Sequence, residues 1–221
     1  TTNNPIAILS ALAEEQQGFV DQLQDPRCIQ HAGRDFWVGQ LHGQSVVLAL
    51  SRIGKVAAAT TAAALIAHFQ VRAIVFTGVA GGVDANVQVG DVVVASGFVQ
   101  HDMDASPLFP RYEIPLTGQS VFATDAILTS ALQRACEASL AELHLQGRQP
   151  HLYLGLIATG DRFVNGALEV ADMVQLLSTH GHAALAVEME GAAVAHGALH
   201  LVGHDGIVEL LRREGHEAVQ R

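Results

Sequence analysis

Two carboxylates lie close together in the stretch "ALAVEMEG", where a predicted buried strand runs into a predicted helix. Alternate residues of a strand share one face, so Glu188 and Glu190 can point to the same place. A carboxylate taken out of water needs compensating partners or a chemical role, which for this group is proton transfer or binding of hydroxyl donors. The dipole of the following helix explains Glu190 as a first-turn acid but does not easily explain Glu188. This strand end is therefore a candidate functional site.

Other predicted strand ends also carry acids, glycines or an aromatic residue. Glu15 ends "SALAEE", although a first-turn helix position explains this acid adequately. The glycines of "FTGVAGG" favour a tight turn with positive φ angles, and close backbone approach to an anion or a ribose is the alternative. This stretch matches neither a Walker loop nor the GxGxxG pattern. Phe163 in "TGDRFVNG" is either a core residue or a ring on which a flat base stacks.

Composition excludes several classes of function. The chain has 221 residues, with 22 Asp and Glu against 12 Lys and Arg and a formal net charge of -10. This charge opposes binding to nucleic acid or to an anionic membrane, and no Lys/Arg cluster offsets it. The 12 His and 2 Cys residues show no metal-ligand or redox spacing, so we expect no metal and no cofactor. No segment has the pattern of a bilayer span or a secretory signal, which predicts a cytoplasmic location.

Strand and helix patterns alternate along the chain, which indicates an α/β fold. We expect one domain over residues 1–221, a three-layer α/β/α arrangement around a mixed, mostly parallel sheet. Ligands of such folds bind beyond the carboxyl ends of strands, where the candidate residues lie. A Pro-rich connection over residues 103–120 is long enough to be a functional loop. Strands are predicted within residues 5–12, 35–51 (a hairpin), 72–82 (ending in a glycine turn), 90–102, 151–166 (ending in a loop) and 183–190, and helices within residues 13–24, 54–70, 125–145, 167–181 and from about Gly191.

Five motifs in order carry a resemblance to one family: "SALAEEQQ", "SRIGKVAAA", "FTGVAGGVDANVQVGDVVV", "GLIATGDRFVNG" and "AVEMEGAAVAH". From about Ile6 to about His200 the chain resembles the methylthioadenosine/S-adenosylhomocysteine nucleosidases of the purine nucleoside phosphorylase superfamily. The resemblance implies a nucleoside phosphorylase-like fold. It also implies hydrolysis of the N-glycosidic bond between adenine and a 5′-thio-substituted ribose, through a transition state with oxocarbenium character.

The resemblance assigns roles to the carboxylates. Glu15 matches the acid that orients and deprotonates the attacking water. Phosphorolytic relatives carry an arginine in the loop after the first strand, and this sequence has no Arg before Arg27, so water is the expected nucleophile. Glu190 matches the acid that grips the ribose hydroxyls, with Met189 against the ribose and Glu188 as a supporting neighbour.

The remaining assignments concern the base and the 5′ group. Phe163 resembles the ring that stacks on adenine, Val164 the residue whose backbone reads the adenine edge, and Asp161 lies in the same loop. Val79 and Ala80 resemble the residues near the sugar. Apolar contacts to the 5′-alkylthio group are implied for Ile53, Pro107 and Leu108. The last two reach in from a partner subunit, so that a homodimer is expected in which the 105–110 loop covers the neighbour's site.

The sequence departs from the family after Leu201. There the family has another buried strand ending in a Ser-Asp pair, whose Asp protonates N7 of adenine, whereas "VGHDGIVELLRREGHEAVQR" follows here. Either a segment is missing from this sequence or the natural chain lacks the strand. The first is favoured, because loss of a central strand would leave an apolar sheet edge. Residues 206–221 then predict a terminal helix, and Asp205 is a substitute acid without a supporting motif.

Two other functions are compatible with these motifs. Without a general acid, the chain could be a nucleoside-binding protein with little or no catalysis. A nucleosidase acting on futalosine or aminodeoxyfutalosine shares the motifs and differs in the 5′ pocket.

Overall fold

The structure, a computed structural model, describes residues 4–145, 147–201 and 207–213. Its helices are α1 (Lys55–Ala67), α2 (Ala126–Leu140), α3 (Ala167–Thr179) and α4 (Gly191–Leu201), with short 3-10 helices η1 (Glu14–Gln16) and η2 (Val20–Gln22). Its strands are β1 (Ile6–Ser10), β2 (Gln24–His31), β3 (Arg34–Leu41), β4 (Gln44–Leu50), β5 (Ala73–Gly82), β6 (Val92–Gln100), β7 (Val121–Ala123), β8 (Leu152–Thr159), β9 (Ala184–Glu188) and β10 (Ile207–Arg213).

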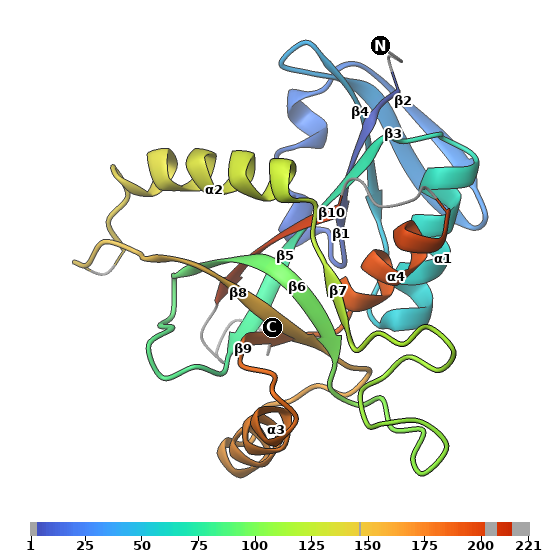
Figure 1. The fold of residues 1–221 in the computed structure, drawn as a ribbon. Coiled ribbons are helices and arrows are strands. Elements are labelled where there is room, and N and C mark those ends of the chain that lie inside the picture. Colours follow the sequence, from blue (N-terminus) through green and yellow to red (C-terminus); the bar gives the residue numbers. More distant parts are fainter. Residues whose placement is uncertain (1–3, 146, 202–206, 214–221) are drawn as a thin grey trace.

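These strands form one sheet that closes on itself over part of its width. Strands β5, β9, β8, β6 and β10 follow one another, and β10 pairs again with β5. Strands β1, β4, β3 and β2 extend the sheet outward from β5 (Figure 1). Among the named strands, five pairings are parallel and five are antiparallel. The mixed sheet with its surrounding helices confirms the predicted α/β fold.

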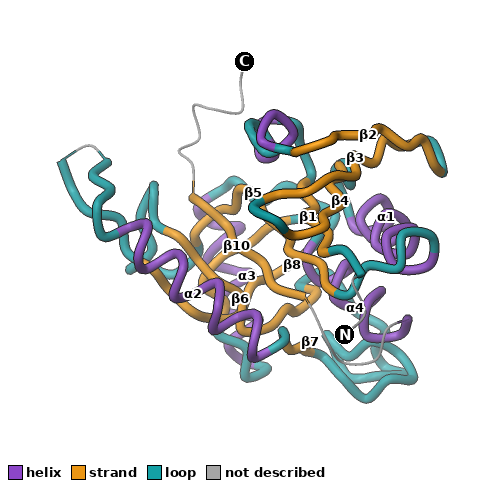
Figure 2. The backbone as a smooth tube through the Cα atoms, turned by 90° about the horizontal axis from the view of Figure 1, so that it is seen from above, coloured by secondary structure: helices purple, strands orange, loops and turns teal. Residues whose placement is uncertain are grey.

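Strand β6 illustrates why helices cover both sides of the sheet. Val92 and Val94 pack against α2, whereas Val93 and Ala95 belong to the main core together with residues of α1 and α4. Successive side chains of a strand point to opposite faces, so an uninterrupted apolar run can be buried on both. Figures 1 and 2 show α2 lying apart from the α1 and α4 pair, with the strands between them.

Small side chains let α1 and α4 approach each other closely. Ala58 and Ala62 of α1 are fully buried, and a Cβ atom added at Gly197 of α4 would lie 3.8 Å from the Ala62 Cβ atom. Helix α1 therefore confirms the prediction for residues 54–70, and its alanines explain how a helix of weak amphipathic pattern is anchored. The position of α4 matters for the site, because its first turn follows directly on Glu190.

The predicted helix over residues 13–24 is wrong. The chain forms only η1 and η2 there, because Gly18 adopts a φ of 88° between them. Gln16 anchors the segment instead, donating through its Nε2 atom to the carbonyls of Ile8 (3.1 Å) and Ala49 (3.0 Å). Residues 25–28 follow in the edge strand β2, which has a register shift between Gln24 and Arg27. The hairpin of β3 and β4 is confirmed.

The glycine turn predicted at the end of residues 72–82 is also wrong, because β5 continues through Gly82. Gly81 and Gly82 pair with Val187 and Ala186 of β9. Neither glycine has a positive φ. A Cβ atom at Gly81 would lie 3.3 Å from Val187 Cγ1, so glycine serves close packing between strands here and not a reversal of the chain.

The terminal helix predicted for residues 206–221 is wrong over Ile207–Arg213, which forms β10. Its backbone runs parallel to β5, with Ile207 opposite Ile74 and Arg213 opposite Ala80, and antiparallel to β6. A strand thus lies between β5 and β6, where the sequence seemed to lack one. Its carboxyl end lies at the same edge as the Gly78 to Ala80 segment of β5.

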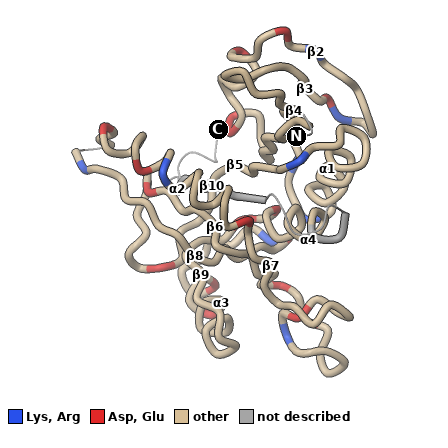
Figure 3. The backbone as a smooth tube through the Cα atoms, turned by 45° about the horizontal axis from the view of Figure 1, so that its top comes forward, with Lys and Arg blue, Asp and Glu red and all other residues tan. Residues whose placement is uncertain are grey.

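Acidic and basic residues are interspersed along the described backbone (Figure 3). In this part of the chain no helix is long and apolar enough to cross a membrane. No group of three or more His, Cys, Asp or Glu residues there is arranged to hold a metal ion.

Candidate active site

Glu15 lies where the chain turns out of β1, and backbone N–H groups hold both of its carboxylate oxygens. Oε2 accepts from the N–H groups of Ala11 (2.9 Å) and Leu12 (2.8 Å), and Oε1 accepts from the N–H of Val79 in β5 (3.1 Å). A Cβ atom at Gly78 would lie 3.1 Å from Oε1. The glycine at that position therefore leaves room for the carboxylate against β5, a function of "FTGVAGG" that concerns close approach and not turning.

Glu190 follows β9 and reaches toward the start of α1. Its Oε1 atom accepts a hydrogen bond of 2.7 Å from the backbone N–H of Gly54. Gly54 has a φ of 97°, a conformation that favours glycine and that aims this N–H at the acid. The side chain is buried, with 6% of the residue exposed. The backbone N–H of Met189 also stabilises the charged form of this side chain, and the described residues provide no further donor to the carboxylate.

Glu188 is the residue that caps α4. Its Oε2 atom accepts from the N–H groups of Glu190 (2.6 Å) and Gly191 (2.7 Å), and its Oε1 atom accepts a short bond from Thr159 Oγ1. Thr159 Oγ1 in turn accepts from the N–H of Ala192 (2.9 Å). From the sequence, the helix dipole explained Glu190 as the first-turn acid. In the structure it is Glu188 that accepts the N–H groups at the start of α4. Its oxygens are occupied, so it holds Glu190 in place from behind.

The three acids form one electrostatic cluster. Burial raises the pKa of Glu190 to about 8, and the charges of Glu188 and Glu15 add to this, while the hydrogen bond from Gly54 opposes it. Burial likewise raises the pKa of Glu188 to about 7 against the hydrogen bonds that favour its charged form. Burial also raises the pKa of Glu15, opposed by the three N–H donors. Perturbed carboxyls at the ends of β1 and β9 are typical of catalytic sites.

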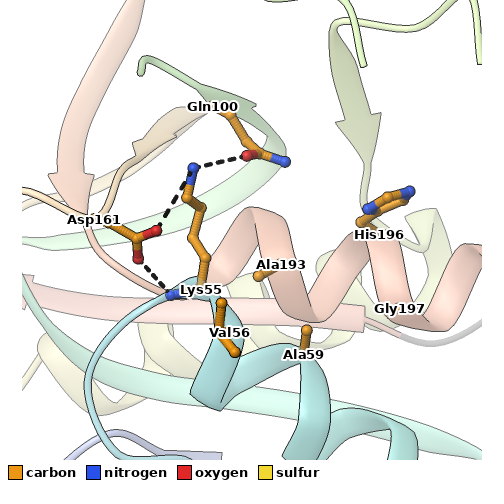
Figure 4. Close-up of a pocket in the computed structure, with 8 residues that line it drawn as sticks. All are labelled: Lys55, Val56, Ala59, Gln100, Asp161, Ala193, His196 and Gly197. Carbon is orange, nitrogen blue, oxygen red and sulfur yellow. Dashed lines mark hydrogen bonds and ion pairs between the residues drawn. The ribbon is translucent and has the colours of Figure 1, made fainter. Parts of the chain in front are cut away.

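A second network joins the loop after β8 to the start of α1. Asp161 Oδ1 accepts from the N–H of Lys55 (2.7 Å), and the N–H of Asp161 donates to Asp102 Oδ2 (2.9 Å). Lys55 Nζ contacts Asp102 Oδ1 at 2.7 Å. It also donates to Gln100 Oε1 (2.9 Å) and lies 4.0 Å from Asp161 Oδ2 (Figure 4). Asp161 is therefore engaged with α1 and fixes the loop of Phe163 relative to Gly54.

A cavity of about 340 Å³ adjoins this network between α1 and α4. Figure 4 shows Lys55 on one side of it and His196 on another. The His196 ring stacks on Phe122 of β7, with the ring centroids 5.1 Å apart. The other residues that line the cavity are Val56, Ala59, Gln100, Asp161, Ala193 and Gly197.

The residues expected to contact the base and sugar differ in their exposure. Phe163 is 55% exposed, so it is not the core residue that the plainer interpretation required. Val164 packs partly against the cluster that contains Leu177 of α3. Met189 lies between the two acids and is partly exposed, and Val79 follows the glycine beside Glu15. Ala80 is buried in the main core.

The residues expected to contact the 5′ group are exposed in the single chain. Ile53 is 56% exposed and Leu108 is 83% exposed, and Pro107 is exposed as well. Ile53 directly precedes Gly54, so it borders the site within this chain. The 105–110 loop is part of the long connection between β6 and β7.

Sequence reasoning did not single out Gly54, Lys55, Asp102 or Thr159. Gly54 and Lys55 lie in "SRIGKVAAA", a motif that carried the resemblance, so that motif held a usable signal. Thr159 lies in "GLIATGDRFVNG", another of the motifs that carried the resemblance, whereas Asp102 lies in none of them. Asp205, the substitute acid, lies outside the described residues.

Known proteins are similar to this chain in both sequence and fold. The model of the phosphorylase superfamily matches residues 5–205. The 5′-methylthioadenosine/S-adenosylhomocysteine nucleosidase of Colwellia psychrerythraea is 37% identical over 195 residues, which are 88% of this chain and 77% of that protein. A crystal structure of S-adenosylhomocysteine nucleosidase from Streptococcus pyogenes, in complex with 5-methylthiotubericidin, has a TM-score of 0.83 and 30% identity, covering 96% of this chain and 84% of the other.

A futalosine hydrolase mutant of Helicobacter pylori has a TM-score of 0.81 and 29% identity, covering 96% of this chain and 89% of the other. The alternative drawn from the sequence is therefore also a structural neighbour. The family model, the curated relative and the fold agree: the chain belongs to the phosphorylase superfamily and, within it, to the 5′-methylthioadenosine/S-adenosylhomocysteine nucleosidases.

Proposed function

We propose that the protein hydrolyses the N-glycosidic bond of 5′-methylthioadenosine and S-adenosylhomocysteine, releasing adenine and the 5′-thio-substituted ribose. The hydrogen bonds of Glu15 support the mechanism most directly. Its two carboxylate oxygens accept hydrogen bonds from three backbone N–H groups, two in the loop after β1 and one in β5. This arrangement fixes the carboxylate in direction beside the Gly78 to Ala80 segment. We infer the substrates from the activities of the similar proteins, and the mechanism from the carboxylates of this chain.

Glu15 acts as the general base. Hydrogen bonds from backbone N–H groups stabilise its ionised form, while burial raises its pKa and makes it a stronger base than an exposed glutamate. In its ionised form it accepts a proton from a water molecule, and the oxygen of that water attacks the anomeric carbon as the bond to adenine breaks. Positioned proton transfer of this kind contributes about 10²–10⁴-fold to the rate.

Glu190 binds the ribose. Its Oε1 atom accepts from the N–H of Gly54, and we assign its other oxygen to a ribose hydroxyl. Burial disfavours the ionised form of Glu190 in the free protein and raises its pKa to about 8. Positive charge that develops on the sugar stabilises that ionised form, so this contact favours the transition state over the ground state. Glu188 positions Glu190 through the backbone bond to its N–H. Met189, Phe163 and Val164 are proposed to complete the sugar and adenine contacts.

Water is proposed as the nucleophile in place of phosphate. The loop after β1 reads Ala11, Leu12 and Ala13, and the N–H groups of the first two are engaged by Glu15. No cationic side chain is available in that loop for a phosphate dianion. The same N–H groups that could cradle an anion hold the base instead.

Among the described residues we assign no general acid to the leaving adenine. It departs with the electron pair of the broken bond and takes its proton from water. Hydrolysis of futalosine or aminodeoxyfutalosine is the second candidate, since the Helicobacter pylori neighbour has a similar TM-score. Binding of the nucleoside without turnover is the third.

We also propose a homodimer in which Pro107 and Leu108 of the 105–110 loop cover the neighbour's site. Support comes from apolar side chains left exposed in one chain: Ile53 at 56%, Phe163 at 55% and Leu108 at 83%. Sedimentation should give twice the chain mass, and Leu108→Asp should shift the protein toward monomer with loss of activity. A monomeric wild-type protein would contradict the proposal.

We also propose that the chain forms one domain and acts in the cytoplasm. The single sheet supports one domain. The unpaired Cys28 and Cys136 support a cytoplasmic location.

The test is release of free base. The protein is incubated with methylthioadenosine, S-adenosylhomocysteine, futalosine, adenosine and inosine, each with and without phosphate. Adenine release from the two thio-substituted nucleosides without phosphate is expected. Strict phosphate dependence would contradict hydrolysis. Preference for futalosine would select the second candidate function, and binding without release would select the third.

A further inference from the structure

Two arginines lie together beside the candidate site. Arg34 begins β3, and Arg52 lies in the loop between β4 and α1. Both line two adjoining cavities, of about 560 and 460 Å³. Ala11 and Leu12, whose N–H groups hold Glu15, line the larger cavity as well. This cavity therefore shares a wall with the catalytic base.

No carboxylate in the described part of the chain forms an ion pair with either arginine. Arg34 donates over 3.3–3.5 Å to the carbonyls of Ala32, Ser51 and Ala57 and to Thr60 Oγ1. Its buried Nε atom has no hydrogen-bond partner there. Arg52 donates to the carbonyl of Gly33 at 3.1 Å. All these acceptors are neutral, so two positive charges remain without compensation in a chain of net charge -10.

The two guanidinium groups also influence each other. Burial lowers the pKa of Arg34, and the charge of Arg52 lowers it further. Like charges held close together are unfavourable unless an anion joins them. A carboxylate accepts charge-assisted hydrogen bonds from guanidinium groups in a fixed geometry, so this pair is suited to one.

Arg52 is held in a backbone conformation that glycine adopts more readily, with a φ of 66°. Such strain in a non-glycine residue persists where the surrounding structure imposes it, commonly at functional sites. Arg52 directly precedes Ile53, which is proposed to contact the 5′ group, and lies close to Gly54, which holds Glu190. A substituent that continues beyond the 5′ sulfur would therefore meet Arg52.

Two aspartates also line the larger cavity. Asp35 lines it beside Arg34, and Asp21 of η2 lines it as well. Asp35 accepts a hydrogen bond from Gln30 at 3.1 Å and is exposed, so its carboxylate can receive a further donor. Two arginines and two aspartates around one space match a ligand that carries both charges, as an amino acid does.

We propose that this cavity receives the amino-acid end of S-adenosylhomocysteine, with its carboxylate on Arg52 and Arg34 and its ammonium group facing Asp35 and Asp21. Methylthioadenosine ends in a methyl group and leaves the cavity to water. The inference rests on the proposed function and adds to it a preference for nucleosides with a zwitterionic 5′ extension.

The experiment compares kcat/KM for S-adenosylhomocysteine with that for methylthioadenosine in three proteins. Arg52→Gly removes the guanidinium and suits the backbone conformation, so the variant should fold. Arg134→Gln on α2, an exposed residue, removes the same charge away from the cavity. We expect Arg52→Gly to lower the ratio of the two kcat/KM values about tenfold or more, and Arg134→Gln to leave it within twofold of wild type.

A third substrate separates carboxylate recognition from general charge effects. The decarboxylated analogue of S-adenosylhomocysteine keeps the amine and lacks the carboxylate, so its kcat/KM relative to methylthioadenosine should not respond to Arg52→Gly. An unchanged ratio for S-adenosylhomocysteine in Arg52→Gly, or an equal fall in Arg134→Gln, would overturn the inference. So would phosphate-stimulated adenine release that Arg52→Gly abolishes, because the pair would then bind the nucleophile.

Failure of the proposed function is distinguishable from failure of this inference. If the wild-type protein releases no adenine from either nucleoside, calorimetry of S-adenosylhomocysteine binding still tests the cavity. A tenfold weaker Kd in Arg52→Gly supports the inference, and an equal Kd overturns it.

Discussion

The carboxylate of Glu190 and the backbone N–H of Gly54 lie 2.7 Å apart, although 136 positions separate them in the chain. This bond joins the end of β9 to the start of α1. It fixes one oxygen of the acid. The geometry of the proposed ribose site therefore depends on a residue that contributes no side chain.

Gly54→Ala should disturb this bond. The residue has a φ of 97°, and an added Cβ atom would lie 3.2 Å from Asp161 Oδ1, so the loop has to shift. We expect kcat/KM for methylthioadenosine to fall at least tenfold and the free energy of unfolding to fall by about 1–2 kcal/mol. Gly181→Ala is the matched control, because Gly181 has a φ of 82° and open space around it. Equal losses of activity in both variants would refute a specific role for Gly54.

Glu188→Ala should act through position and stability. It removes the acceptor for Thr159 Oγ1 and for the N–H groups of Glu190 and Gly191, all of them buried. Leaving buried donors unpaired costs about 1–3 kcal/mol each, so a fall of several kcal/mol in the free energy of unfolding is expected. Glu188→Gln keeps an oxygen acceptor and should restore most of the stability and activity. Urea denaturation and adenine release measure both; a Gln variant as damaged as Ala would show that the charge itself is required.

The raised pKa of Glu190 predicts a pH-dependent stability. Between its ordinary pKa of 4.5 and the folded value of about 8, the folded state binds more protons than the unfolded state. The free energy of unfolding contributed by this group therefore falls as the pH rises through that range. Glu190→Gln should make the protein more stable at pH 8 by on the order of 2 kcal/mol, with a smaller difference at pH 5.

Urea denaturation at the two pH values checks this, with Glu14→Gln as an exposed-acid control. The idea of a strained, buried ribose acid would have to be abandoned if Glu190→Gln were less stable than wild type at pH 8.

The sequence was sufficient to predict the α/β class, most helices and strands, and the strand ends where the acids lie. The sequence also assigned Glu188 a supporting role beside Glu190, but it did not predict that Glu188 accepts the N–H groups at the start of α4, because strand alternation says which residues share a face and not which oxygen meets a helix terminus. It also misassigned the glycines of β5, since the need for space beside Glu15 and Val187 arises only from pairing with distant strands.

Segments with mixed signals were the least predictable. Residues 13–24 favour a helix by propensity, yet Gly18 and the anchoring of Gln16 in the sheet allow only 3-10 turns. The local sequence of Ile207–Arg213 favours a helix. In the structure this segment forms a strand, because it pairs with both β5 and β6. In both cases tertiary pairing outweighs local propensity.

The central claim is that Glu15 activates water, and Glu15→Gln tests it most directly. Glutamine preserves the size of the side chain and one oxygen for the N–H groups, but it cannot accept the proton. We expect adenine release from methylthioadenosine to fall by about 10²–10⁴-fold, with the Kd for the nucleoside, measured by calorimetry, within about fivefold of wild type. A Glu15→Gln protein that binds methylthioadenosine normally and releases adenine at the wild-type rate would contradict the account.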